Sequence, residues 1–171
     1  IVRDLPHLLE PGDLLVVNTT RVLPARLPLR KATGGAAEVL LLERIDGSTW
    51  EALVRPSRKL PGGTELRPPN GDADLRVVVG ADLGNGRRHV ELIVEGDELA
   101  VLERHGLMPL PPYITETLAD PERYQTVFSD RPESAAAPTA GLHLTPELLA
   151  RCAERGIELA EVELVVGLGT V

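Results

Sequence analysis

The stretch DLRVVVGADLGNGRRHVELIVE, residues 74–95, predicts two β-strands joined by a tight turn. Each half is rich in Val, Leu and Ile, and the pair Asn85–Gly86 separates the two halves. Asn and Gly tolerate the positive φ angles of a two-residue primed turn, so this pair is a strong hairpin signal. Further short strand-like runs lie upstream, at residues 38–43 and 49–55. Closely spaced strands with turn signals predict a small barrel or sandwich.

The segments on both sides of these strands predict a different architecture. The run LLVV, residues 14–17, is typical of a fully buried strand. Downstream, helices are expected to begin after Asp97 and Thr145, because both residues are good N-caps. A second apolar strand, IELAEVELVV, follows at residues 157–166. Alternating helices and buried strands indicate an α/β layer that is split by a β-rich insert.

The composition places the chain among ordinary globular proteins, since 43% of its 171 residues are hydrophobic and 26% are charged. Its net charge of −8, taken alone, argues against a polyanionic partner, although local basic patches can override it. No apolar run approaches the roughly 18 residues that span a bilayer, and there is no basic-then-apolar leader. The single cysteine, Cys152, can form no internal disulfide, which fits a reducing cytoplasm. Both ends stop within predicted elements, so we expect a fragment of a longer cytoplasmic protein.

Polar residues follow the first predicted strand in the stretch VVNTTRVLPARL. Asn18, Thr19, Thr20 and Arg21 lie where this strand leaves the core. The carboxyl ends of strands line the usual binding crevice of open α/β sheets, so the position favours ligand binding. The alternative is a turn in which the Asn and Thr side chains satisfy their own backbone.

A dense group of cations lies in the stretch ALVRPSRKLPGG, residues 52–63. Arg55, Arg58 and Lys59 are interleaved with Pro56 and Ser57 just after a predicted strand. Guanidinium groups suit phosphate and carboxylate, and the rigid Pro-Ser backbone limits how far these cations spread. The alternative is a solvated loop, which runs of charge usually form.

A lone histidine follows a run of small residues in the stretch SAAAPTAGLHLTPELL, residues 134–149. Small residues let a ligand approach the backbone, and the helix start at Thr145 offers unpaired N–H groups. His143 can transfer a proton there, because imidazole serves as acid or base near neutral pH. The alternative is a histidine that is hydrogen-bonded into its loop. No His-x-x-x-His, Cys pair or carboxylates at metal-ligand spacing occur, so we expect no metal site.

Seven motifs occur in a fixed order: LLVVNTTRVLPARL, EVLLLE, WEALVRPSRKL, GLMPLPPYI, ERYQTVF, AAPTAGLHLT and VGLGT. In this order the chain resembles the S-adenosylmethionine:tRNA ribosyltransferase-isomerase family of queuosine biosynthesis, over nearly its whole length. LVRPSRKL and APTAGLH are the most specific parts of the match. The resemblance implies a fold of the class α/β plus all-β, with an α/β domain interrupted by an inserted small β-barrel. We expect residues 1–24 and 97–171 in the α/β domain and residues 25–96 in the barrel.

The resemblance implies that the ribosyl part of S-adenosylmethionine moves onto a 7-aminomethyl-deazaguanine base at the wobble position of tRNA. The ribose is rearranged to an epoxycyclopentanediol, adenine and methionine leave, and the product is epoxyqueuosine. The implied partners are S-adenosylmethionine, as the ribosyl-donor substrate, and the anticodon loop of tRNA. We expect no metal cofactor, no membrane, a cytoplasmic location and a monomer.

The same resemblance assigns roles to the polar motifs. A sulfonium acidifies the neighbouring C5′ proton, so the reaction needs a base beside the nucleoside and a proton donor for departing adenine. His143 is expected to carry the proton and to be catalytic together with Arg21. The small residues 137–141 are expected to make room for the nucleoside. The expected substrate-binding residues are Asn18, Arg55, Ser57, Arg58, Lys59, Tyr124, Gln125, Thr139 and Gly141.

Several positions depart from the usual pattern of the family. Thr19 replaces an acidic residue, Val165 a second histidine and Leu144 a phenylalanine, and Thr115–Glu116 stand where a basic residue is common. The loss of two ionisable groups bears directly on proton transfer. The alternative is therefore a diverged paralogue, which keeps the fold and a nucleoside or RNA pocket without this activity. A purely structural interaction module fits less well, because the polar motifs cluster at strand ends.

Overall fold

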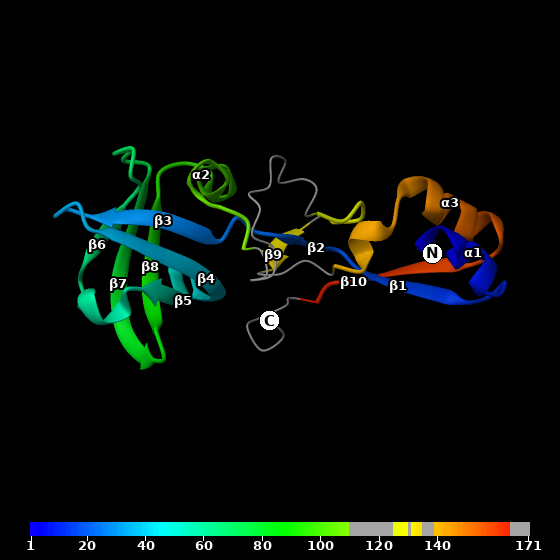
Figure 1. Cartoon of the computed structure of the whole chain (residues 1–171), viewed down its shortest axis with the longest axis horizontal. Helices are drawn as coiled ribbons and strands as arrows, with labels where there is room; N and C mark the ends of the chain where they lie inside the picture. The colour runs from blue at the N-terminus through cyan, green and yellow to red at the C-terminus, as the bar shows by residue number, and fades with distance from the viewer. Residues whose placement is uncertain (110–124, 130, 135–138, 165–171) are drawn as a thin grey trace. The chain divides into compact units, whose positions relative to one another are not determined.

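Figure 1 shows the computed structural model, which describes residues 1–109, 125–129, 131–134 and 139–164. Two compact units make up the described chain: residues 1–22 belong with the described part of residues 125–164, and residues 23–109 form the other unit. The first unit contains parallel strand pairs with helices, and the second contains a closed barrel. The predicted class, an α/β domain interrupted by an inserted β-barrel, is confirmed.

The barrel is closed by six antiparallel strands in the order β3-β4-β5-β8-β7-β6. Inward and outward side chains alternate along each strand, as in β5, where Trp50, Ala52 and Val54 are buried and the residues between them are not. This period of two follows from the pleat of an extended chain and lets one face of each strand fill the barrel. The strands are β3 (Arg26–Lys31), β4 (Ala36–Asp46), β5 (Thr49–Arg55), β6 (Glu65–Arg67), β7 (Leu75–Gly84) and β8 (Arg87–Val94).

The hairpin between β7 and β8 has the predicted two-residue tip. Gly84 pairs with Arg87, which leaves Asn85 and Gly86 as the loop. Both loop residues have positive φ, 53° for Asn85 and 83° for Gly86, as a primed turn requires. The Asn-Gly pair therefore fixes the register of this hairpin.

Helix α2 (Glu98–His105) packs on the barrel rather than standing apart from it. Its N-cap, Asp97, accepts a hydrogen bond from the backbone N–H of Ala100 at 2.9 Å. Val101 and Leu102 are buried in the same apolar cluster as the barrel strands. The domain boundary predicted at residue 97 stays a prediction, and the structure shows α2 in the compact unit of residues 23–109.

The close return of the chain after α2 depends on a glycine. The backbone of Leu107 exchanges hydrogen bonds with Arg26 at 2.8 and 3.1 Å. A Cβ atom on Gly106 would lie 1.9 Å from the carbonyl oxygen of Pro24, a distance that no side chain tolerates. Gly106 therefore lets the end of α2 close against the start of the barrel.

The first unit brings together strands that are far apart in the sequence. β1 (Leu14–Asn18) pairs in parallel with β10 (Glu158–Val162), and both lie within the apolar runs predicted as strands of one α/β layer, residues 14–17 and 157–166. The predicted full burial of these strands is wrong, because the sheet has two strands in the described chain and leaves Leu14, Val16, Leu159 and Val162 exposed. β2 (Thr20–Val22) pairs in parallel with β9 (Arg131–Ser134). The helical elements of this unit are η1 (Val2–Asp4), α1 (Leu5–Leu8), η4 (Gly141–His143) and α3 (Pro146–Glu154).

Helix α3 begins as its sequence predicts. The hydroxyl of Thr145 accepts a hydrogen bond from the backbone N–H of Leu148 at 3.2 Å, and Pro146 occupies the first turn. Leu148 and Cys152 are buried on one face of the helix. Among the helices of the described residues, none is both long and apolar enough to cross a membrane.

Candidate functional site

The polar residues at the end of β1 bond to the chain that follows β10. The side-chain amide of Asn18 donates to the carbonyl of Leu164 at 2.8 Å and accepts from its N–H at 3.0 Å. The hydroxyl of Thr19 donates to the carbonyl of Val162 at 3.2 Å, and that of Thr20 donates to Leu164 at 3.3 Å. These contacts hold the carboxyl ends of the two parallel strands together. The observed hydrogen bonds are structural: they join two segments, and Asn18 Oδ1 also accepts a local hydrogen bond from the N–H of Thr20 at 3.3 Å.

A second amide clasp fixes residue Gln125 to β2. Its side-chain oxygen accepts from the N–H of Val22 at 2.9 Å, and its nitrogen donates to the carbonyl of Val22 at 2.8 Å. The clasp joins positions 103 residues apart. Arg21 precedes Val22 in β2 and is half-buried. Tyr124, which the sequence also singled out, lies outside the described residues.

His143 is exposed at the end of η4. Within the described part of the chain, its imidazole has no hydrogen-bond or ion-pair partner, so both ring nitrogens are available. Thr139 is also exposed, and Gly141 is half-buried in the same loop. The histidine is therefore not hydrogen-bonded into its loop by its side chain.

Gly141 leaves space that neighbouring protein side chains occupy, and not space open to a ligand. A Cβ atom on Gly141 would lie 3.0 Å from the ring of Phe128 and 3.1 Å from the methyl group of Thr126. Contacts this short are tighter than ordinary van der Waals packing, so only glycine fits without a shift. The loop that carries His143 is thereby pressed against residues 126–128.

The N-terminus of α3 already has a carboxylate beside it. Glu147 lies in the first turn, and its pKa is lowered by hydrogen bonding to its own backbone N–H and, second, to the hydroxyl of Thr145. A carboxylate there satisfies the partial positive charge of the helix end. Glu147 therefore already supplies a negative charge at the helix start where the sequence suggested an anion site.

The cations of the barrel loop are exposed and unpaired among the described residues. Arg55 ends β5, and Arg58 and Lys59 lie in the short helix η2 (Ser57–Lys59). Leu60, which follows them, is fully buried and anchors the loop to the barrel core. Several other exposed arginines of the barrel form ion pairs, as Arg87 does with Glu51 at 2.6 Å. The loop therefore concentrates positive charge that the described carboxylates leave uncompensated.

These predicted residues are divided between the two compact units. Asn18, Arg21 and His143 belong to the α/β unit, and Arg55 belongs to the barrel unit. The shared role implied by the resemblance predicts that these four residues converge on one concave site, and this stays a prediction.

An apolar hollow of about 260 Å³ lies between α3 and the strands β1 and β10. It touches none of the predicted site residues, and Glu158 is the one charged residue that lines it. The hollow has no polar groups placed to orient a nucleoside, so its position gives no support to a binding role. Its lining consists of Leu15, Leu149, Ala150, Cys152, Ala153, Ile157, Glu158 and Leu159.

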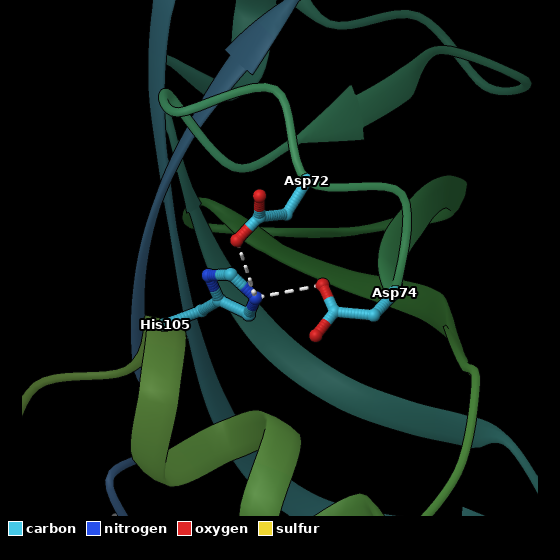
Figure 2. Close-up of side chains that lie close together, drawn as sticks. All are labelled: Asp72, Asp74 and His105. Carbon is cyan, nitrogen blue, oxygen red and sulfur yellow. Dashed lines mark hydrogen bonds and ion pairs between the residues drawn. The ribbon is translucent and has the colours of Figure 1, made fainter.

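The structure also brings together three residues that the sequence did not single out. Figure 2 shows His105, at the end of α2, between the carboxylates of Asp72 and Asp74. Burial raises the pKa of Asp74, but the hydrogen bond from His105 and the charges of His105 and Arg104 outweigh it, so the pKa lies below its usual value. More than thirty residues separate the histidine from the carboxylates, so no local spacing rule could find the cluster.

The comparisons with known proteins agree with the motif order. All residues, 1–171, match the family model described as "Queuosine biosynthesis protein". The chain is 55% identical to the S-adenosylmethionine:tRNA ribosyltransferase-isomerase of Moorella thermoacetica, over 98% of this chain and 49% of that protein. It is 53% identical to the protein of the same name from Symbiobacterium thermophilum, again over 98% and 49%.

A solved structure, the S-adenosylmethionine tRNA ribosyltransferase of Thermotoga maritima, is 33% identical to this chain. The match covers 98% of this chain and 45% of that one, with a TM-score of 0.40. The chain thus spans about half the length of the curated relatives it matches. The chain belongs to the queuosine biosynthesis protein family.

Proposed function

We propose that the full-length protein moves the ribosyl part of S-adenosylmethionine onto a 7-aminomethyl-deazaguanine base in tRNA and isomerises it, giving epoxyqueuosine. The observation that carries this proposal is the 50–55% identity, over 98–99% of the chain, to proteins named S-adenosylmethionine:tRNA ribosyltransferase-isomerase. These relatives are about twice as long as this chain, so the activity is assigned to the whole protein.

His143 is the proposed proton carrier. The reaction needs a base for the acidic C5′ proton beside the sulfonium and a proton donor for departing adenine. The exposure of His143 and the absence of a side-chain partner within the described residues support this role. General acid–base catalysis requires such a ring within hydrogen-bond reach of the reacting atoms. Arg21 is the proposed second catalytic group.

The barrel loop is the proposed anion-binding element. Arg55, Arg58 and Lys59 would hold tRNA phosphates or the methionine carboxylate of the donor, with Ser57 between them. Their lack of described acidic partners supports this, because neutralised cations add little to phosphate binding. The proposed partners are S-adenosylmethionine and the anticodon loop of tRNA, and the protein is proposed to act as a cytoplasmic monomer without a metal in the reaction.

The amide residues take a supporting part in this proposal. Asn18 and Gln125 already use their amide groups to hold backbone segments together. We assign them to positioning the site, with Thr139, Gly141 and Tyr124 along the nucleoside wall. The proposed domains are an α/β domain over residues 1–24 and 97–171 and a barrel over 25–96, and the packing of α2 on the barrel favours moving that boundary to the end of α2.

The diverged paralogue is not favoured, since identities of 50% and above extend over the whole chain. Thr19, which replaces the acidic residue of the family, has a structural role here, since its hydroxyl donates to the carbonyl of Val162 at 3.2 Å. An active parent enzyme that is unaffected by Thr19→Asp with Val165→His would show that neither missing group is needed. A parent that gains activity from the double change would establish the paralogue.

The test is a direct assay of the full-length protein. It is incubated with S-adenosylmethionine and a tRNA that carries the 7-aminomethyl-deazaguanine base. The expected result is release of adenine and methionine in equal amounts, with conversion of the base to epoxyqueuosine by mass spectrometry. Intact substrates, under conditions in which the Moorella thermoacetica relative converts them, would contradict the proposal.

A further inference from the structure

A cluster of potential metal ligands lies on the barrel unit. Asp72 is in the loop between β6 and β7, Asp74 immediately precedes β7, and His105 ends α2. One donor atom from each residue lies within 4.8 Å of the other two. An imidazole nitrogen with two carboxylate oxygens is a donor set suited to divalent transition metals.

The spacing of the donors fits a single small ion. His105 Nε2 lies 2.8 Å from Asp74 Oδ1 and 3.8 Å from Asp72 Oδ2. Around a tetrahedral zinc ion with bonds of about 2.0–2.2 Å, neighbouring donors lie about 3.4 Å apart. The two distances to His105 bracket that value, and all three donor atoms lie within 4.8 Å of one another, so the carboxylates would have to move closer to each other to complete the site.

The surrounding contacts orient both carboxylates, and Asp72 Oδ2 already accepts a hydrogen bond that a bound ion would share or replace. Arg104 bonds to Oδ2 of Asp74, which leaves Oδ1 directed at His105. The side-chain amide of Asn70 donates to Asp72 Oδ2 at 2.7 Å and so orients that carboxylate. Partners of this kind normally hold metal-binding carboxylates in place.

The three side chains of the cluster differ in exposure, so an ion would reach the cluster from the side of Asp72. The side chain of His105 is 4% exposed and that of Asp74 is 17% exposed, whereas that of Asp72 is 46% exposed. The carboxylates of Asp72 and Asp74 face one guanidinium, that of Arg104. A bound cation would replace the hydrogen bond between His105 Nε2 and Asp74 Oδ1.

The geometry points to a binding site for one divalent transition-metal ion, best matched by Zn²⁺, formed by Asp72, Asp74 and His105. Three protein ligands leave a fourth position for water, as in open zinc sites. The ion joins the end of α2 to the β6–β7 loop and so stabilises the barrel. This proposed site is separate from the proposed reaction, and it departs from the expectation, drawn from motif spacing, that the chain has no metal site.

The test uses the whole 171-residue chain, freed of metal with a chelator, and Zn²⁺ alone as the probe. Calorimetric titration should show one ion per chain, and Zn²⁺ should raise the unfolding temperature. Asp72→Asn should weaken binding at least about tenfold, the scale expected when a metal site loses a supporting group. The exposed residue Asp46 offers a matched control, and Asp46→Asn should leave binding unchanged.

Two further readouts identify the ligands. Binding should shift the imidazole resonances of His105 in an NMR spectrum, and the Co²⁺ form should lack absorption from a thiolate. Absence of binding would overturn the site, as would binding that Asp72→Asn leaves unchanged. A Co²⁺ spectrum with thiolate absorption would also overturn it, because Cys152 would then be the ligand.

Discussion

The side-chain amide of Gln125 forms two hydrogen bonds with the backbone of Val22, one as acceptor at 2.9 Å and one as donor at 2.8 Å. This pair holds Gln125 on β2, next to Arg21 in the sequence of that strand. The side chain of Gln125 supplies the acceptor of one bond and the donor of the other, so replacing it removes both. The stability of such a variant measures the role of Gln125 in the fold.

Gln125→Ala should lower the free energy of unfolding by about 2 kcal/mol, since each net hydrogen bond contributes about 1 kcal/mol. Urea denaturation measures the difference. Thr139→Ala, at an exposed position, should change stability by less than about 0.5 kcal/mol. Equal stability of Gln125→Ala and the parent would contradict the structural role of the clasp.

Gly141→Ala should destabilise the α/β unit by about 1–3 kcal/mol, the usual cost of overpacking. The added methyl group would lie 3.0 Å from the Phe128 ring. Phe128→Leu should relieve part of this penalty, so a double-mutant cycle should give a coupling energy above about 0.5 kcal/mol. Additive effects of the two changes would show that the ring is not what Gly141 accommodates.

Glu147 should make stability depend on pH. Hydrogen bonds from its own backbone N–H and from Thr145 hold its pKa below the ordinary value of 4.5. Because the folded pKa is depressed, charged Glu147 stabilises the protein above pH 4.5, and this contribution is lost as pH falls through the folded pKa. In Glu147→Gln, the free energy of unfolding should therefore fall less steeply as pH drops below 4.5 than it does in the parent protein. Glu154→Gln, at the other end of α3, should keep the steeper parent curve.

Arg58→Ala in the full-length protein should weaken tRNA binding and reduce its logarithmic salt slope by about one, the effect of one lost phosphate contact. Arg87→Ala is the matched control, because Arg87 is equally a barrel arginine but is paired with Glu51. Fluorescence anisotropy at several salt concentrations gives both slopes. An unchanged slope for Arg58→Ala, or equal losses for both variants, would contradict the phosphate role of the loop.

Local signals in the sequence predicted local structure well. Asn85–Gly86 specifies its hairpin because both positions need positive φ, and Thr145 specifies a helix start because its hydroxyl caps Leu148. The apolar run at residues 14–17 predicted a strand, and this strand pairs in parallel with β10 from the other apolar run. Its predicted full burial was wrong, because Leu14 and Val16 are more than half exposed in the described chain. Each of these depends on a few consecutive residues.

Contacts across long stretches of chain could not be read in the same way. The clasp between Gln125 and Val22 and the pair His105–Asp74 join residues 103 and 31 positions apart. Whether α2 belongs to the α/β unit or to the barrel depends on which surface its apolar side packs against. Val101 and Leu102 pack in the barrel core. Sequence patterns specify that a face is apolar, but not which element covers it.

In the proposed reaction, His143 carries the proton during ribosyl transfer from S-adenosylmethionine. The most direct test of this role is the single-turnover rate of adenine release by His143→Ala in the full-length enzyme, with His7→Ala as an exposed-histidine control. We expect the rate of His143→Ala to be lower than that of the parent by roughly a hundredfold or more, the scale of a general acid–base group, with tRNA and donor binding retained. A rate within about twofold of the parent, with His7→Ala also unchanged, would contradict it.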